Sequence, residues 1–187
     1  MGSRDKYMKN NHTVKIREIS LRQDKAEGYG GSPKKYIDPF LPIFKIIYYA
    51  KGNYQVVDRY TGQEQNIGQA IYFYHKQPVY GLNYYGIVTT KKLKANIIFE
   101  FLKETLRAGA GKSIHRGLNG YKRDEWLYRN KFTEKHGFVE GEEKIYYKGS
   151  LVYIQVYHGG AIADQRSYKE WAKHLLPVKE LKRKIKL

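Results

Sequence analysis

Two segments of this chain carry the same spacing of glycine and tyrosine, and this feature constrains the fold more than any other. A shift of 73 positions, from Gly68 to Gly141, lays residues 68–88 on residues 141–161 without a gap. The residues that coincide are Gly68 with Gly141, Tyr74 with Tyr147, Val79 with Val152, Tyr80 with Tyr153, Tyr84 with Tyr157, and Gly86 with Gly159. Aromatic and β-branched residues flank a short turn in each segment, so each segment predicts a β-hairpin. The shared spacing favours an internal duplication of about residues 43–90 and 117–162.

Other segments predict further strands and two helices. Residues 91–107 place an apolar stripe opposite charged residues, and residues 14–27 carry a weaker stripe that Thr13 would cap and Gly28 would end. The predicted strands span residues 44–50, 54–60, 70–75, 79–88, 126–132, 139–147 and 151–158. We therefore expect an α+β fold in which two similar halves, each a helix plus a β-meander, form one antiparallel sheet with both helices on one face.

The length of 187 residues suits one domain with a tail. We predict a disordered N-terminus over residues 1–13, a single α+β domain over residues 14–164, and a basic helical tail over residues 165–187. The sequence has no apolar run long enough to span a membrane, no apolar signal region and no cysteine. These absences favour a cytoplasmic protein without disulfides.

The charge of the chain indicates an anionic partner. Lysine and arginine number 35 against 18 acidic residues, which gives a formal net charge of +17, and the chain contains 19 tyrosines. A basic surface attracts nucleic acid, nucleotides or an acidic protein, and tyrosine rings can stack on bases. A bias toward lysine across the whole proteome is the alternative explanation. The basic tail could likewise bind an acidic protein partner, or be a solvated last helix.

Common catalytic and cofactor-binding motifs are missing from the sequence. It contains no HExxH metal motif, no GxSxG nucleophile elbow and no GxGxxG following a strand. The GAGKS at residues 109–113 resembles the end of a phosphate-binding loop, but the predicted helix precedes it instead of following it. We therefore predict neither a metal nor a cofactor.

Polar side chains cluster where the two predicted hairpins end. Asn83 and Tyr84 come shortly before a glycine in the first hairpin, and Tyr157 and His158 come directly before two glycines in the second. Glycine beside a polar strand end lets a ligand approach the backbone closely. We expect both ends to converge on one cleft, where Asn83, Tyr84 and Tyr157 would bind the ligand.

Charged side chains in nearby segments would complete this site. Arg116 suits an anion clamp, or a structural ion pair with the glutamates around Glu143. His158 is the strand-end residue suited to general acid/base catalysis, with Glu143 as a second acid/base or orienting group. Asp58 is a weaker candidate, because a strand carboxylate usually pairs with a neighbouring basic residue.

Four stretches of the sequence resemble a known family: YQVVDRYTG, GQAIYFYHKQPVYGLNYYG, FLKETLRAGAGKSIHRG and GFVEGEEKIYYKGSLVYIQVYHGGAIAD. They are similar to the bacterial and archaeal domain of unknown function 5680, over about residues 19–164. The most specific parts are NYYG at residues 83–86, Arg116 with Gly117, GEEKI at residues 141–145 and YHGG at residues 157–160. The resemblance implies a stand-alone cytoplasmic domain, which in relatives is sometimes attached to a helix-turn-helix DNA-binding region. It implies no reaction, because the family has no established activity.

Three functions remain open at this point. The first is a module that binds an anionic ligand, nucleic acid or a nucleotide, at a Tyr-rich cleft rimmed by basic residues. The second is a small enzyme acting on a phosphorylated or nucleotide substrate, with His158 as the proton shuttle and Arg116 as the anion clamp. The third is a protein-interaction or regulatory module that uses the basic tail. The sequence does not decide between an enzyme and a binding protein, and it leaves the oligomeric state open.

Overall fold

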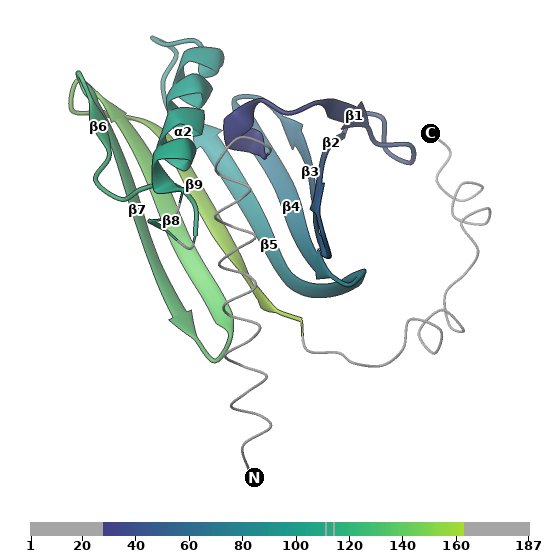
Figure 1. The fold of residues 1–187 in the computed structure, drawn as a ribbon. Helices are drawn as coiled ribbons and strands as arrows, with labels where there is room; N and C mark the ends of the chain where they lie inside the picture. Colours follow the sequence, from purple (N-terminus) through teal and green to yellow (C-terminus); the bar gives the residue numbers. More distant parts are fainter. Residues whose placement is uncertain (1–27, 111, 114, 163–187) are drawn as a thin grey trace.

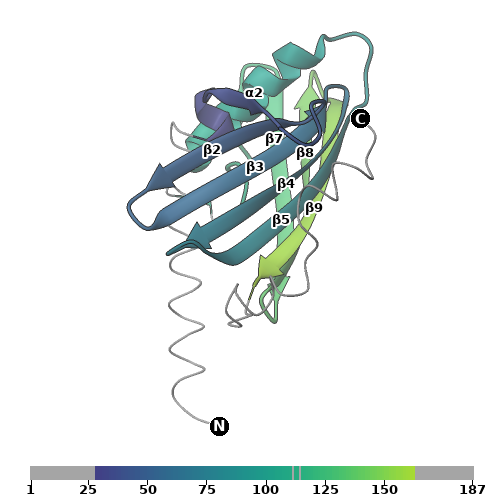
Figure 2. The same cartoon turned by 90° about the vertical axis from the view of Figure 1, so that its right-hand side faces the viewer.

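A single antiparallel sheet dominates the computed structural model, which describes residues 28–110, 112–113 and 115–162 (Figure 1). In these residues, nine strands lie in the order β1-β2-β3-β4-β5-β9-β8-β7-β6. Their bounds are Lys35–Ile37 for β1, Lys45–Lys51 for β2, Tyr54–Gly62 for β3, Gln65–Tyr74 for β4, Gln77–Val88 for β5, Lys122–Arg123 for β6, Trp126–Lys135 for β7, Phe138–Tyr147 for β8 and Ser150–Ala161 for β9. The first five strands form one meander and the last four form another. The two meanders join where β5 pairs with β9, and Figure 2 shows these strands side by side.

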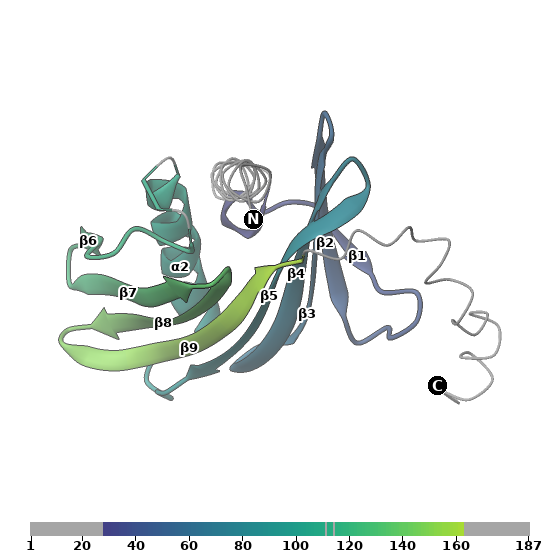
Figure 3. The ribbon, with the colours of Figure 1, turned by 90° about the horizontal axis from the view of Figure 1, so that it is seen from below.

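The sheet is curved, and its concave face holds the helix α2 (Ala95–Gly109) and the short 3-10 helix η2 (Tyr29–Gly31) (Figure 3). The pairing register shifts between Tyr72 and Phe73 of β4 and again between Ile145 and Tyr146 of β8. Such irregularities bend a strand and increase its twist. Because the sheet wraps around α2 and η2, the sheet and both helices contribute side chains to the concave interior.

Helix α2 buries the apolar stripe that its sequence predicts. Ile98, Phe101, Leu102 and Leu106 are buried against the second meander, where they meet residues such as Tyr128. The helix begins four residues later than predicted, at Ala95, and it ends two residues later, at Gly109. A second core cluster, around Val56, Tyr72 and Leu82, lies mainly in the first meander and also includes Val139 and Tyr157 of the second.

The predicted strands are confirmed, but the expected α+β fold with two helix-plus-meander halves is wrong. Among the residues that the structure describes, nine strands accompany one α-helix, so the domain is mainly β. Several strands are longer than predicted: β4 already begins at Gln65, five residues before the predicted strand, and β9 continues to Ala161, three residues beyond it. β1 and β6 fall in segments rich in glycine and proline, where no strand is predicted.

The glycine and tyrosine spacing has a direct structural cause. Gly68 lies opposite Tyr84 in the pairing of β4 with β5, and Gly141 lies opposite Tyr157 in the pairing of β8 with β9. A Cβ atom added to Gly68 would lie 2.3 Å from Cζ of Tyr84, and one added to Gly141 would lie 2.2 Å from Cζ of Tyr157. Each ring therefore lies flat over a glycine, which keeps that glycine within the strand. Packing within one sheet thus accounts for two of the six coinciding pairs, Gly68 with Gly141 and Tyr84 with Tyr157. The internal duplication stays a prediction.

Gly68→Ala is expected to lower the free energy of unfolding by about 1–3 kcal/mol, because the new methyl group would displace the Tyr84 ring. Urea denaturation at pH 7 measures this loss. Gly81→Ala in β5 is the matched control, since the nearest atom to its Cβ would be the end of the Ile71 side chain, at 3.2 Å. Equal stability of the two variants would contradict the packing of Tyr84 on Gly68.

Three predictions concern residues outside the described ranges. They are the disordered N-terminus at residues 1–13, the helix at residues 14–27 and the basic tail at residues 165–187. The protein-interaction function that uses the tail also stays a prediction. Within the described ranges, α2 is too short and too polar to cross a lipid bilayer, and no other helix there could do so.

Candidate functional site

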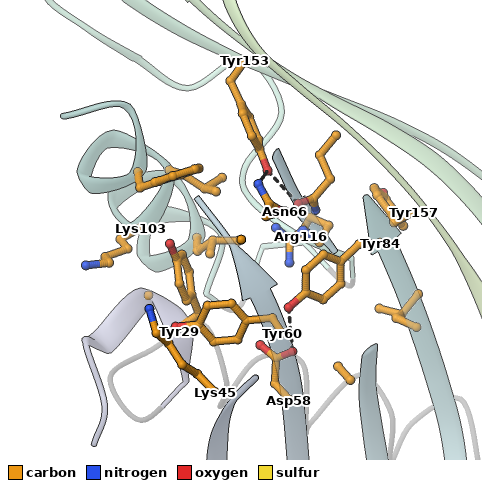
Figure 4. Close-up of a pocket in the computed structure, with 18 of the residues that line it drawn as sticks. Tyr29, Lys45, Asp58, Tyr60, Asn66, Tyr84, Lys103, Arg116, Tyr153 and Tyr157 are labelled. Atoms are coloured by element: carbon orange, nitrogen blue, oxygen red, sulfur yellow. Dashed lines mark hydrogen bonds between the residues drawn. The ribbon is translucent and has the colours of Figure 1, made fainter. Parts of the chain in front are cut away.

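A cavity of about 230 Å³ opens on the concave face between the sheet, α2 and η2 (Figure 4). Aromatic rings and charged groups share its wall. The tyrosines are Tyr29, Tyr60, Tyr72, Tyr84, Tyr153 and Tyr157, the basic residues are Lys35, Lys45, Lys103 and Arg116, and the acidic residues are Asp58 and Glu100. An aromatic wall with a few converging polar groups is typical of a small-molecule site.

A buried ion pair holds Arg116 in the wall of the cavity. Glu143 of β8 is fully buried, and Arg116 donates two hydrogen bonds to it, from Nε at 3.1 Å and from Nη2 at 2.7 Å. The hydroxyl of Tyr128 donates to the same carboxylate at 2.5 Å. Burial alone would lower the pKa of Arg116, but the charge and hydrogen bonds of Glu143 raise it well above its ordinary value. The guanidinium is therefore charged and held in one orientation.

The loop after α2 fixes Arg116 through its backbone. Arg116 has a left-handed conformation, with φ of 59°. The N–H of Gly117 donates to the hydroxyl of Tyr128 at 3.1 Å, and the carbonyl of His115 accepts from Nδ2 of Asn130 at 2.8 Å. Strand β7 supplies both Tyr128 and Asn130. The loop is thus anchored to the sheet on each side of Arg116.

Asp58 of β3 is the second buried charged group of the cavity. Its carboxylate is 5% exposed and accepts a hydrogen bond from the hydroxyl of Tyr84 at 2.7 Å. The guanidinium of Arg116 lies over the Tyr84 ring, 5.7 Å from its centroid (Figure 4). Burial raises the pKa of Asp58 to about 6, although the Tyr84 hydrogen bond and the Arg116 charge oppose this shift. A carboxyl group with a raised pKa inside a cavity often marks a functional site.

Three lysines, which we call the lysine mouth, line the cavity: Lys35 and Lys45, which are exposed, and Lys103, which is partly buried. The Nζ atoms of Lys35 and Lys103 lie 5.8 and 5.7 Å from the centroid of the Tyr29 ring. Lys45 lies opposite Tyr60 in the pairing of β2 with β3. Lys103 binds Glu100 at 2.6 Å, whereas no acidic side chain in the described ranges forms an ion pair with Lys35 or Lys45. Lys35 and Lys45 therefore offer uncompensated positive charge to a ligand.

Three buried polar atoms in the cavity wall have no hydrogen-bond partner among the described residues. They are the hydroxyl of Tyr60, Nδ1 of His115 and Nε2 of Gln155. Burial and the nearby Asp58 raise the pKa of Tyr60 to about 12, so this hydroxyl keeps its proton at neutral pH. A buried polar atom without a partner costs about 1–3 kcal/mol. All three atoms are therefore candidate contacts for a bound ligand.

The structure brings most of the sequence-predicted site residues together. Tyr84, Arg116 and Tyr157 line the concave cavity, and Glu143 lies behind Arg116 as its ion-pair partner. Tyr84 and Tyr157 face each other in the pairing of β5 with β9. Their roles in binding remain predictions.

The other two predicted residues lie on the convex face. Asn83 and His158 are opposite each other in the pairing of β5 with β9, and Gln69 donates to Oδ1 of Asn83 at 2.8 Å. Successive residues of a strand point to opposite faces, so His158 points away from the side of the sheet that holds Arg116 and Glu143. The structure therefore does not bring the predicted catalytic pair, His158 and Glu143, to one substrate.

Several residues of the cavity carry only a weak signal in the sequence. Asp58 is one of them, although it alternates with Val56 and Tyr60, and all three are buried on one face of β3. A carboxylate in such an alternating pattern is a signal for a buried charge. The residues of the lysine mouth come from β1, β2 and α2, and no local pattern connects them.

His115 also lines the cavity and was not selected. It is buried between Tyr80 and Phe132, with Nε2 3.4 Å from Glu134. Burial lowers the pKa of His115, so the ring is neutral at pH 7. In the described part of the chain, no three histidine, aspartate or glutamate side chains are grouped as metal ligands.

Comparison with known proteins agrees with the resemblance seen in the sequence. Residues 58–162, more than half of the chain, match the domain of unknown function DUF5680. The chain belongs to the DUF5680 family. The segment that matches DUF5680 begins at Asp58 and includes Arg116, whereas Lys35 and Lys45 precede it. No curated protein and no solved structure matches the chain.

Proposed function

We propose that this DUF5680 protein binds a small anionic ligand of the nucleotide class in the concave cavity. The phosphate lies at the lysine mouth and the base lies among the tyrosines. The observation that carries this proposal is the joint position of Lys35 and Lys103 beside Tyr29, at the entrance of an aromatic cavity. Lysines attract phosphate through charge, and tyrosine rings provide apolar faces for a base.

The shape of the site favours a single nucleotide over a long nucleic acid. The lysine mouth and the tyrosines line one cavity of about 230 Å³. Arg116 adds little net charge to this site, because Glu143 neutralises it. Binding should therefore depend on the lysine mouth for charge and on the tyrosines for contact area.

The triple variant Lys35→Gln, Lys45→Gln, Lys103→Gln is expected to weaken the binding of adenosine and guanosine monophosphates about ten- to hundredfold. Each lost charge contributes about 0.5–1 kcal/mol. Isothermal titration calorimetry of the full chain at low salt measures this loss, and higher salt should weaken wild-type binding because it screens the charges.

A second triple variant controls for the change in net charge. Lys51→Gln, Lys76→Gln and Lys122→Gln remove three exposed charges outside the cavity wall. This variant should bind both nucleotides as tightly as wild type. Equal losses in the two triple variants, or wild-type affinity that does not change with salt, would contradict a specific phosphate site at the lysine mouth.

A further inference from the structure

Asp58 presents an unused hydrogen-bond acceptor to the cavity. Its Oδ1 accepts from Tyr84, whereas Oδ2 receives no hydrogen bond from any residue in ranges 28–110, 112–113 and 115–162. A carboxylate has about four acceptor sites, so most of its capacity is free. Asp58 is only 5% exposed, and little bulk water can reach it. A ligand inside the cavity can therefore stabilise this carboxylate by donating a hydrogen bond to it.

Glu100 and Arg116 form their ion pairs with other residues, so Oδ2 of Asp58 remains available to a ligand. Glu100, the second acidic residue of the wall, binds Lys103 at the mouth. Arg116 is directed to Glu143, and it reaches Asp58 only through the Tyr84 ring that lies between them. The free atoms of Tyr60 and Gln155 are donors, so they suit an acceptor on the ligand.

We infer that Asp58 selects nucleotides whose base carries an amino group, an inference that rests on the proposed nucleotide binding. Adenine, cytosine and guanine each have an exocyclic amino group that can donate to Oδ2 of Asp58. Uracil has no amino group, and carbonyl oxygens flank its ring N–H. Those oxygens would face the carboxylate and repel it. The hydroxyl of Tyr60 and the amide of Gln155 supply donors for the carbonyl oxygen or ring nitrogen of an accepted base.

Titration calorimetry with AMP, CMP, GMP and UMP tests this selection in the full chain. Wild type is expected to bind the three amino-bearing nucleotides at least about tenfold more tightly than UMP. Asp58→Asn places an amide, which also donates, where the carboxylate stood. This variant should bind the amino-bearing nucleotides at least about tenfold more weakly, and UMP equally or more tightly. Asp124→Asn changes an exposed carboxylate outside the cavity and should leave all four affinities unchanged.

Two results would overturn the inference while leaving nucleotide binding in place. One is wild-type affinity for UMP equal to that for the other three, with the dependence on the lysine mouth intact. The other is an Asp58→Asn variant that binds all four nucleotides more weakly by the same factor. That result would show that Asp58 shapes the cavity but does not discriminate between bases. Absence of binding for all four nucleotides and for inorganic phosphate would instead overturn the proposed function and this inference together.

Discussion

Glu143→Ala is expected to lower the free energy of unfolding by about 3–5 kcal/mol, the largest loss among the single substitutions considered. Glu143 is fully buried and accepts hydrogen bonds from Arg116 and Tyr128. Without this carboxylate, a charged guanidinium that is only 19% exposed has no counter-ion. Removing one partner of a buried ion pair is costly for this reason. Urea denaturation at pH 7, followed by circular dichroism, measures the loss.

Two further variants separate the ion pair from general effects of substitution. Glu142→Ala removes a half-exposed carboxylate that binds Lys144, and it should cost less than about 1 kcal/mol. The double variant Arg116→Met, Glu143→Met removes both charges, and it should recover most of the stability lost in Glu143→Ala. If Glu143→Ala costs no more than Glu142→Ala, the buried pair does not stabilise the fold in the way described.

The strands could be predicted from the sequence because their pattern is local. Aromatic and β-branched residues mark β3 and β9 directly, and the apolar stripe marks α2. The extent of the strands could not be predicted this way. Gly68 falls outside the predicted strand at residues 70–75, but it stays in the sheet because Tyr84 covers it from the neighbouring strand. That contact depends on which residues lie opposite each other in neighbouring strands. The residue pattern of one segment does not give this pairing.

The candidate site was only partly predictable for a related reason. Grouping residues by their nearness in sequence joined Asn83 with Tyr84, although adjacent strand residues face opposite sides of a sheet. The same rule separates His158 from the concave face. The link between Arg116 and Glu143 was foreseen as one of two alternatives, and the structure shows the ion pair. Asp58 and the lysine mouth lie around one cavity because the strand order and the curvature of the sheet bring β1, β2, β3 and α2 together.

Asp58→Asn is expected to raise the free energy of unfolding by up to about 3 kcal/mol at pH 7 to 8. Burial raises the pKa of Asp58 from 3.8 to about 6, and one pKa unit corresponds to about 1.4 kcal/mol. Between these two pH values the folded protein binds more protons than the unfolded chain. Stability therefore falls as pH rises from about 4 to 6, and the loss is complete above pH 6. Asparagine has no charge to bury, and it can still accept the hydrogen bond from Tyr84.

Thermal and urea unfolding of wild type and Asp58→Asn between pH 3.5 and 8 measure this difference. The two proteins should be about equally stable below pH 4, and they should diverge as the pH rises. Arg116 and Tyr84 favour the ionised form of Asp58, but burial outweighs them. Asp124→Asn, on an exposed side chain, should show no such divergence. Lower stability of Asp58→Asn at pH 8 would mean that the ionised carboxylate holds the fold together. Higher stability, together with lost selection of amino-bearing bases, would show that Asp58 lowers the stability of the fold and serves binding, a trade-off common at functional sites.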